Sequence, residues 1–342
     1  MEPKEVDHDE AIQDVIQQLV VMSGESKDGD VIAQMIQTVV DLARARTGRG
    51  DLKLINSALR ELLLATRVFA PYRDRRKVTI FGSARSKEES AEYRAAADFG
   101  RLCVERGYMV ITGAGDGIMR AGHEGAGADH SFGVNILLPF EQLANTVIAD
   151  DPKLVTFKYF FTRKLVFMKE SHAVALFPGG FGTQDEGFES LTLTQTGKAQ
   201  MMPIVFIDVP GGHYWKDWET YVVERILGRG LISESDLHLF HRTNDIVEAL
   251  DHIDRFYRVY HSLRFVRRRL VLRLRSRPSD ELIERLNTDF ADIVVNGRIE
   301  ASGMLPDEAN EPEIADLPRL LLPFNRRDYG RLRQLIDAVN DG

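Results

Sequence analysis

The segment with the clearest chemical character is the glycine-rich turn Pro178-Gly179-Gly180-Phe181-Gly182-Thr183, which joins an apolar run to a predicted helix. Its glycines let the backbone turn sharply and approach a ligand closely. The start of the following helix presents free N–H groups and the positive end of the helix dipole, and Thr183 adds a hydroxyl group. This combination predicts a phosphate site. A tight strand–helix turn, with Thr183 as an ordinary N-cap, would have the same composition.

Ionisable residues lie close to this turn. Glu186 and Glu189 are three residues apart on the predicted helix and share a face. A carboxylate there can stabilise the positive charge that develops on a sugar when an N-glycosidic bond breaks, or it can orient ribose hydroxyls or activate water. The helix dipole alone also favours an acid in the first turn. Upstream, Arg163 and Lys164 form a pair of cations that suits a phosphate, although a solvated helix start would look the same.

Two more apolar runs end in glycine turns. The segment Gly113-Ala114-Gly115-Asp116-Gly117 lacks the last glycine of the dinucleotide fingerprint, and its acid would repel a phosphate. We therefore expect this turn near the ribose or base, or in a purely structural role. Ser83, in Phe81-Gly82-Ser83-Ala84, can bond a phosphate or a sugar hydroxyl, or simply form a turn. The Walker type of phosphate loop is absent from the sequence.

These turns belong to a region, residues 76–258, in which apolar strands alternate with helices. The strands are predicted at KVTIFGS, YMVITGAG, SFGVNILLP, LVTFKYFF, AVALFPGG and PIVFID. This alternation is typical of an α/β fold, a Rossmann-like parallel sheet with helices on both faces. Ligands bind such sheets at the carboxyl ends of the strands, so we expect all three glycine turns at one edge.

The flanking regions differ in pattern. Residues 1–75 carry apolar residues at helical spacing and are predicted as a helical N-terminal region, with Asp51 as an N-cap. Residues 259–342 are predicted as a small α+β C-terminal appendage, with Ser279 capping a helix. Basic residues in this appendage form either an anion-binding strand face or ion pairs with nearby acids, the second being the default. They are Arg267, Arg269, Arg273 and Arg275.

Composition limits the partners. The 342 residues include 44 basic and 52 acidic side chains, and the net charge of −8 opposes general binding to nucleic acid. Cys103 is the only cysteine, which excludes a disulfide within the chain and a cysteine-based metal site. The acidic N-terminus lacks an apolar signal core, and no apolar run approaches the ~20 residues of a membrane span. We therefore expect a cytoplasmic protein without a membrane partner.

The region around the cations and the first glycine turn resembles the LOG family of nucleoside-monophosphate phosphoribohydrolases, which are often mislabelled lysine decarboxylases. Its hallmarks are R-K-x-x-M and P-G-G-x-G-T-x-x-E. Residues 178–183 and Glu186 match the second motif fully. Arg163 and Lys164 match the first in part, because Phe167 stands at the methionine position. The stretch Gly117-Ile118-Met119 fits a third family feature, and the resemblance covers roughly residues 77–225.

The resemblance implies hydrolysis of the N-glycosidic bond of nucleoside 5′-monophosphates to free base and ribose 5-phosphate, with Arg163 and Glu186 as the catalytic pair. It also implies a homodimer or higher homo-oligomer, no cofactor and no metal. The terminal additions resemble a longer, bacterial-type branch, for which nucleotide salvage is as well expected as cytokinin activation. Motifs and resemblance together predict these substrate-binding residues: Ser83, Gly113, Gly115, Gly117, Met119, Asn145, Lys164, Gly179, Gly180, Phe181, Gly182, Thr183 and Thr192.

Two other functions compete with hydrolysis. A non-catalytic nucleotide or molybdenum-cofactor carrier of the same fold would keep the glycine turns but would not need Glu186 together with Arg163. Decarboxylation with pyridoxal phosphate would need a Schiff-base lysine and a partner for the pyridinium nitrogen. None of the lysines nearest the motifs has that context; they are Lys158, Lys164, Lys169 and Lys198.

Overall fold

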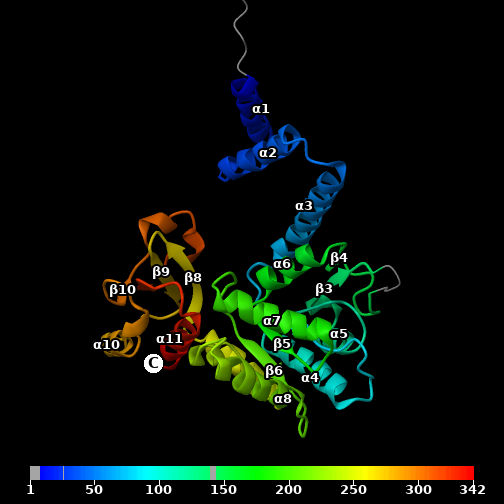
Figure 1. The fold of residues 1–342 in the computed structure, drawn as a ribbon, viewed down its shortest axis with the longest axis vertical. Helices are drawn as coiled ribbons and strands as arrows, with labels where there is room; N and C mark the ends of the chain where they lie inside the picture. Colours follow the sequence, from blue (N-terminus) through cyan, green and yellow to red (C-terminus); the bar gives the residue numbers. More distant parts are fainter. Residues whose placement is uncertain (1–7, 26, 139–143) are drawn as a thin grey trace, which may run out of the picture. The chain divides into compact units, whose positions relative to one another are not determined.

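The computed structural model describes residues 8–25, 27–138 and 144–342. The chain divides into two compact units, Met1–Arg60 and Glu61–Gly342 (Figure 1). Within the described ranges, no helix is long and apolar enough to cross a membrane. The prediction that the N-terminus lacks a signal core rests partly on residues 1–7, which lie outside the described residues. The domain boundaries predicted at residues 76 and 259 stay predictions.

The first unit is helical, as its apolar spacing predicts. It contains α1 (His8–Ser23), α2 (Gly29–Arg44) and the start of α3 (Arg49–Phe69). Ile16 and Val20 of α1 are buried, and Gln13 of α1 donates a hydrogen bond of 2.7 Å to Gln37 of α2. The prediction that Asp51 caps the third helix is wrong. The helix already begins at Arg49, so Asp51 lies inside its first turn, where the helix dipole favours an acid.

The second unit is built on a parallel sheet with the strand order β4-β3-β2-β1-β5-β6-β7. This confirms the predicted α/β fold. The strands are β1 (Lys77–Phe81), β2 (Met109–Thr112), β3 (Ser131–Ile136), β4 (Leu154–Phe157), β5 (Ala173–Leu176), β6 (Ile204–Ile207) and β7 (His241–Thr243). The order reverses direction between β1 and β5, the place where sheets of this kind bind ligands.

Helices cover both faces of the sheet (Figure 1). One core lies between the sheet and α4, α5 and α9, and the other between the sheet and α6, α7, α8 and the end of α3. The helices are α4 (Ala91–Glu105), α5 (Ile118–Ala126), α6 (Phe160–Glu170), α7 (Phe181–Gln195), α8 (Tyr214–Tyr221) and α9 (Ile246–Phe256).

The predicted strand LVTFKYFF is shorter than its apolar content suggests. Strand β4 ends at Phe157 and α6 begins at Phe160. The cause lies in another helix: the carboxylate of Glu61, on α3, accepts hydrogen bonds from the Lys158 amide at 2.9 Å and from the Thr162 hydroxyl at 2.5 Å. These contacts hold the chain where it turns from strand to helix.

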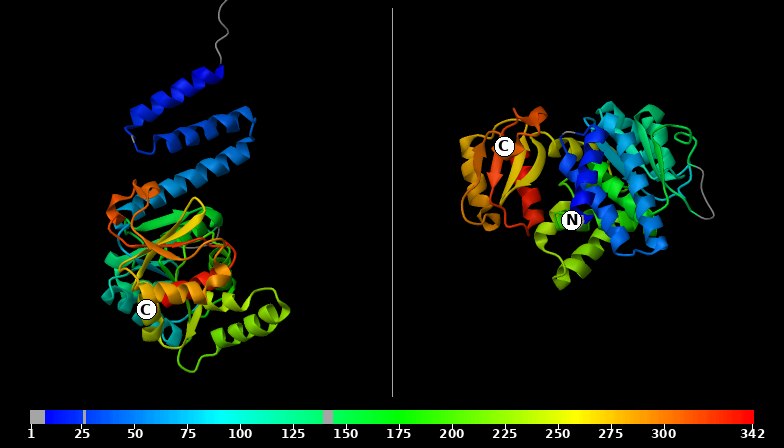
Figure 2. Two further views of the ribbon diagram at one scale, coloured as in Figure 1. Left: turned by 90° about the vertical axis from the view of Figure 1, so that its left-hand side faces the viewer. Right: turned by 90° about the horizontal axis from the view of Figure 1, so that it is seen from above.

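The C-terminal residues form an antiparallel sheet of order β10-β11-β9-β8, which lies beside the parallel sheet in the same unit (Figure 2). Ser279 caps α10 as predicted, because its hydroxyl accepts a hydrogen bond of 3.1 Å from the Leu282 amide. Strand β8 was not predicted, since its alternating polar residues are only half-buried. The elements are β8 (Tyr260–Val266), β9 (Arg269–Leu274), α10 (Asp280–Asp289), β10 (Glu300–Ser302), β11 (Arg319–Leu322) and α11 (Tyr329–Asp341).

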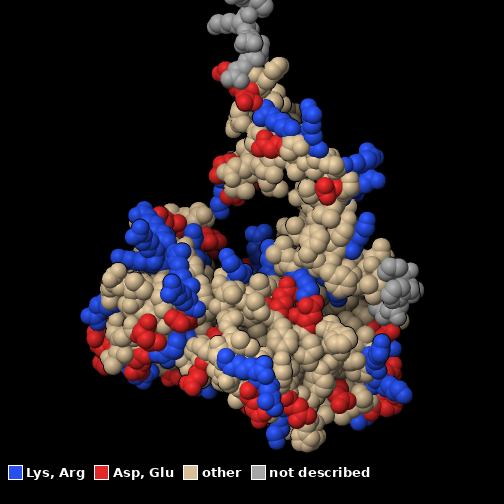
Figure 3. Space-filling model, in the orientation of Figure 1, with Lys and Arg blue, Asp and Glu red and all other residues tan. Residues whose placement is uncertain are grey.

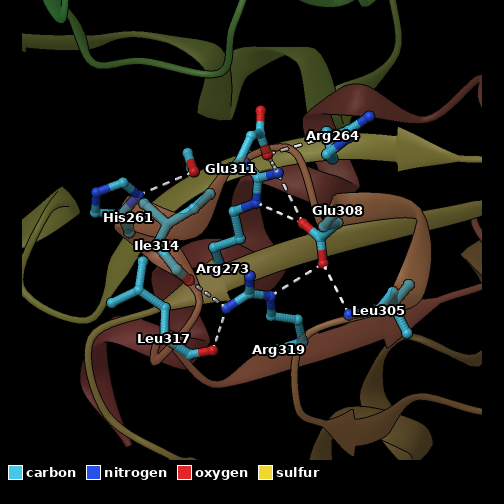
Figure 4. Close-up of polar contacts among 10 residues, drawn as sticks. His261, Arg264, Arg273, Leu305, Glu308, Glu311, Ile314, Leu317 and Arg319 are labelled. Carbon is cyan, nitrogen blue, oxygen red and sulfur yellow. Dashed lines mark hydrogen bonds and ion pairs between the residues drawn. The ribbon is translucent and has the colours of Figure 1, made fainter. Parts of the chain in front are cut away.

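Basic side chains gather over this C-terminal sheet (Figure 3), but acids pair with most of them. Buried Arg273 and Arg319 share the carboxylate of Glu308, at 2.7 Å and 3.1 Å (Figure 4). Arg267 pairs with Asp307 and Arg269 with Glu300. The ion-paired interpretation is therefore confirmed for Arg267, Arg269 and Arg273, whereas Arg275 donates a hydrogen bond of 3.3 Å to the Tyr257 carbonyl.

Candidate active site

The three glycine turns meet at the carboxyl edge of the parallel sheet, as predicted. The turns after β1 and β5 are joined by the Ser83 amide, which donates a hydrogen bond of 3.1 Å to the Pro178 carbonyl. The turns after β1 and β2 are joined by the Ile118 amide, which donates a hydrogen bond of 3.0 Å to the Ser83 carbonyl. Ser83 thus links the ends of three strands that are neighbours in the sheet.

Glycine is needed where these turns approach one another. Gly117 has a φ of +61°, and a Cβ atom there would lie 2.2 Å from the Ser83 carbonyl oxygen. A Cβ on Gly113 would lie 2.5 Å from a guanidinium nitrogen of Arg163, and one on Gly179 would lie 2.1 Å from the Thr183 hydroxyl. Any side chain at these positions would displace a backbone atom or a polar group of the site.

The turns surround a cavity of about 730 Å³. Both members of the proposed catalytic pair, Arg163 and Glu186, line it. Of the predicted substrate-binding residues, the cavity is lined by Ser83, Gly113, Met119, Gly179, Gly180, Phe181, Gly182 and Thr183. These residues come from β1, β2, β5 and the helices that follow, so the fold brings distant motifs into one space.

One end of the cavity is the first turn of α7, which starts at Phe181 and exposes backbone N–H groups. Thr183 is 6% exposed, and its hydroxyl has no hydrogen-bond partner among the described residues. Tyr214, from the start of α8, donates a hydrogen bond to the Gly179 carbonyl and accepts one of 2.7 Å from Gln184. Free donors at a helix start, held by a well-anchored turn, form a suitable site for an anion.

Arg163 projects from α6 into the middle of the cavity wall. Its Nε donates a hydrogen bond of 2.9 Å to the Val134 carbonyl at the end of β3. Its guanidinium carbon lies 5.1 Å from the centre of the Phe167 ring. Burial lowers the pKa of Arg163, and the nearby carboxylate of Glu186 opposes that shift. Arginine stays protonated in proteins, so Arg163 presents a fixed, oriented cation.

Glu186 is 8% exposed and lies one turn further along α7 than Thr183. Burial raises its pKa to about 7, against the opposing effects of Lys164 and Arg163. A carboxyl group with this pKa exchanges its proton near neutral pH, which is the range that suits a general acid or base. Buried groups with strongly shifted pKa values are typical of active sites.

The remaining predicted residues do not line the cavity. Lys164 is held by Asp185 at 2.8 Å and by Glu189 at 2.6 Å, which neutralise its charge. Thr192 is exposed on α7, roughly 13 Å along the helix axis from Thr183 at 1.5 Å per residue. Neither position supports direct contact with a ligand in this cavity.

The other three act behind the cavity. Gly117 contacts the turn of Ser83, as described above. Asn145 is buried, and its side-chain amide donates a hydrogen bond of 3.0 Å to the carbonyl of Gly115. Its backbone amide donates a hydrogen bond of 2.8 Å to the Ala114 carbonyl. These contacts hold the turn after β2, in which Ala114 has a φ of +61°. Asn145 therefore supports the glycine turn from behind.

Several lining residues were not predicted from the sequence. Asn135 lies within a predicted strand of mostly apolar residues, SFGVNILLP. Phe160 was assigned to the next predicted strand, LVTFKYFF. Tyr214 lies 31 residues beyond Thr183 and reaches the site only through the fold. The polar Asn135 within β3 was a usable signal; nothing local marks Tyr214. Among the described residues, no group of three or more His, Cys, Asp or Glu is placed to hold a metal.

Residues 113–253 match a protein-family model described as "Possible lysine decarboxylase". A 166-residue stretch is 33% identical to a rice protein (Oryza sativa subsp. japonica) named "Probable cytokinin riboside 5′-monophosphate phosphoribohydrolase LOGL5". That stretch covers 46% of this chain and 63% of the relative, so the chain spans less than two thirds of the relative's length.

Solved structures resemble about half of the chain. One is a molybdenum cofactor binding protein from the phototrophic bacterium Rippkaea orientalis, and another is the Moco carrier protein from Chlamydomonas reinhardtii. Each is 16% identical with a TM-score of 0.37, and each match covers 53% of this chain and 96% of the other. The family model spans Arg163, Thr183 and Glu186, and together with the rice relative it shows that this chain is similar to the LOG family.

Proposed function

We propose that this protein hydrolyses the N-glycosidic bond of nucleoside 5′-monophosphates, releasing the free base and ribose 5-phosphate. The observation that carries the proposal is one cavity that joins an anion-binding helix start to a buried carboxyl group. Thr183 stands at the helix start, and Glu186, whose pKa is about 7, lies one turn beyond it. The rice relative named as a phosphoribohydrolase supports the same reaction class.

The phosphate is expected at the start of α7. Its oxygens would accept hydrogen bonds from the backbone amides after Gly180 and from the unpaired Thr183 hydroxyl. This places the ribose beside Glu186 and Arg163, which line the same cavity. A substrate without the phosphate would lose these contacts, so adenosine should be a much poorer substrate than AMP.

In the reaction, water adds to C1′ of the ribose as the bond from C1′ to the base nitrogen breaks. The hydroxide part of the water stays on the sugar, and its proton ends on the departing base. Glu186 in its carboxylate form stabilises the positive charge that develops on the ribose and accepts the proton of the attacking water. Arg163, fixed by the Val134 carbonyl, orients the substrate and keeps Glu186 ionised at the moment of reaction.

The test is to incubate the purified protein with AMP, without added cofactor, and to measure adenine and ribose 5-phosphate. The variants Glu186→Gln and Arg163→Ala should each lower kcat at least about 100-fold. Glu189→Gln is the matched control, because it removes a carboxylate from the same helix but outside the cavity. If both site variants keep wild-type turnover while folding normally, the assignment is wrong.

The same experiment addresses the alternative of a nucleotide or molybdenum-cofactor carrier. A carrier would bind its ligand tightly and release no base, and Glu186→Gln would leave the affinity nearly unchanged. The enzyme is favoured here because a carrier needs no buried carboxyl group with a pKa of about 7 beside an arginine. A titration of AMP alongside the turnover assay distinguishes the two outcomes.

The proposal extends to the cellular setting. We expect a cytoplasmic enzyme that acts on ordinary purine or pyrimidine monophosphates in nucleotide salvage, as a homodimer or higher homo-oligomer. Light scattering coupled to size-exclusion chromatography measures the oligomeric state directly. Comparing AMP with cytokinin monophosphates as substrates decides between salvage and hormone activation.

A further inference from the structure

A second buried polar group lines the cavity, far from the phosphate end. Asn135 is 6% exposed, and its side-chain amide has no hydrogen-bond partner among the described residues. The polar atoms of this amide are not enclosed in the packed core but are accessible from the cavity, so a ligand bound there can reach them. A ligand in the cavity would supply the missing hydrogen bonds.

The fold explains why Asn135 is accessible to a ligand. In β3, Val134 and Ile136 pack into the core shared with α6, and alternation along the strand places Asn135 on the opposite face. Strand β2 ends at Thr112, which pairs with Gly133, whereas the partner of Asn135 is Thr156 of β4. No residue of β2 therefore lies beside Asn135, and the cavity opens there.

The position along the sheet identifies the part of the substrate that Asn135 would meet. Strand β3 is three places from β5 in the sheet, which is roughly 14 Å at about 4.8 Å per strand. Arg163 bonds the Val134 carbonyl in β3, has a guanidinium nitrogen beside Gly113 after β2 and interacts with the charge of Glu186 on α7, so it lies between the two ends. With phosphate at the start of α7 and ribose beside Glu186, the end of β3 is left for the base.

We propose that the Asn135 amide binds the base of the nucleotide through one donated and one accepted hydrogen bond, and so determines which bases are hydrolysed. This inference rests on the proposed function. An amide carries an N–H donor beside a C=O acceptor, and rotation by half a turn exchanges them. It can therefore match the amino group and ring nitrogen of adenine, or the oxo group and ring N–H of guanine. The unmodified protein should accept both.

The variant Asn135→Asp tests this directly, because an ionised carboxylate accepts hydrogen bonds but donates none. The Watson–Crick edge of guanine offers two donors to a carboxylate, whereas adenine places a ring-nitrogen acceptor against it. The ratio of kcat/KM for GMP to that for AMP should rise about tenfold or more in the variant. General damage to catalysis affects both substrates and cancels in this ratio.

Two further variants complete the design. Asn135→Leu, which keeps the number and branching of the side-chain heavy atoms, removes both hydrogen bonds and should lower kcat/KM for AMP and GMP alike, mainly through KM. Thr156→Asp is the matched control, because Thr156 is the strand partner of Asn135 but is exposed and outside the cavity. It should leave the GMP-to-AMP ratio at its wild-type value.

The outcomes separate the two proposals. If wild-type protein hydrolyses nucleotides but Asn135→Asp leaves the ratio unchanged, Asn135 does not bind the base, and the proposed function stands. If wild-type protein releases no base, the proposed function fails, and titration of AMP and GMP by calorimetry replaces kinetics. The same tenfold shift, now in the affinity ratio, would then support the role of Asn135. An unchanged affinity ratio, or no binding of either nucleotide, would overturn it.

Discussion

Glu186 illustrates how a group suited to catalysis can lower the stability of the fold that holds it. Burial raises its pKa from 4.5 to about 7, so the folded protein keeps this proton at pH values where the unfolded chain has lost it. The favourable contribution of the protonated group is complete below about pH 4.5. It is lost as the pH rises through 7, because the folded state must then bury a charge.

Replacing Glu186 with Gln should therefore stabilise the protein at alkaline pH while abolishing turnover. A glutamine side chain is neutral at every pH, so the expected gain in the free energy of unfolding is roughly 1–3 kcal/mol at pH 8. At pH 4 the gain should nearly vanish, because Glu186 is then largely protonated in both the folded and the unfolded state. Urea unfolding at the two pH values measures it, with Glu189→Gln as the control. Equal stability of wild type and Glu186→Gln at pH 8 would show that the carboxyl group is not strained by burial.

At the scale of single elements, the turn after β2 depends on Gly117. Its φ of +61° and its approach to the Ser83 carbonyl make two separate demands on the residue, one conformational and one steric. Gly127, at the end of α5, shares only the first demand: its φ is +74°, and a Cβ atom there would meet nothing within 4 Å. Comparing alanine substitutions at Gly117 and Gly127 therefore isolates the steric contribution to the free energy of unfolding.

Gly127→Ala should lower the free energy of unfolding by about 2 kcal/mol, because its backbone, with φ +74° and ψ +155°, lies in a region that only glycine adopts readily. Gly117→Ala should lower it by about 3 kcal/mol and should also reduce turnover, because the added atom displaces the Ser83 carbonyl that ties three turns together. Chemical unfolding and AMP hydrolysis measure both effects. Similar losses for the two variants would mean that the turn relaxes without disturbing Ser83.

The start of helix α6 is held by a contact that no local sequence pattern predicts. Glu61, on α3, accepts hydrogen bonds from the Lys158 amide and the Thr162 hydroxyl at the start of the helix that carries Arg163. Glu61→Ala should cost about 1 kcal/mol of stability, as the loss of a helix cap does, and should lower kcat more than it raises KM. Glu61→Gln keeps a carbonyl oxygen and should recover part of both losses. Unaltered kcat in the alanine variant would exclude a positioning role.

The difference between local patterns and long-range contacts explains what could be predicted from the sequence. The parallel sheet and its three glycine turns follow from strong local patterns, whereas the pairing of Arg163 with Glu186 in one cavity was implied by the family resemblance. The position of Lys164 could not be predicted, since its charge is taken up by Asp185 and Glu189 on another helix. Asn145 was expected to contact the ligand but supports a turn, and Tyr214, for which no role was predicted, lines the cavity. Long-range packing decides which polar residue lines a cavity and which supports it.

At the scale of the whole molecule, the unit Glu61–Gly342 is expected to unfold as one body although it contains two sheets. Its C-terminal core includes Met201, Leu239 and Phe256 from the α/β region together with strands β8, β9 and β11. Helix α11 packs so closely that a Cβ on Gly330 would lie 2.2 Å from the Ser235 carbonyl. A shared core and tight backbone contact couple the stability of the two sheets.

Glu308→Ala tests this coupling. The variant leaves the guanidinium groups of Arg273 and Arg319 buried without their shared carboxylate, which should cost about 3 kcal/mol. The chain's two tryptophans, Trp215 and Trp218, both belong to the core under the parallel sheet, so their fluorescence reports only on that sheet. If the two sheets unfold as one cooperative unit, Glu308→Ala should lower the unfolding midpoint that tryptophan fluorescence reports, although the substitution lies in the C-terminal sheet.

Glu300→Ala, which breaks the exposed pair with Arg269, is the control and should cost no more than about 0.5 kcal/mol. A tryptophan midpoint that stays at its wild-type value, while circular dichroism shows loss of the C-terminal sheet, would establish two independently unfolding parts.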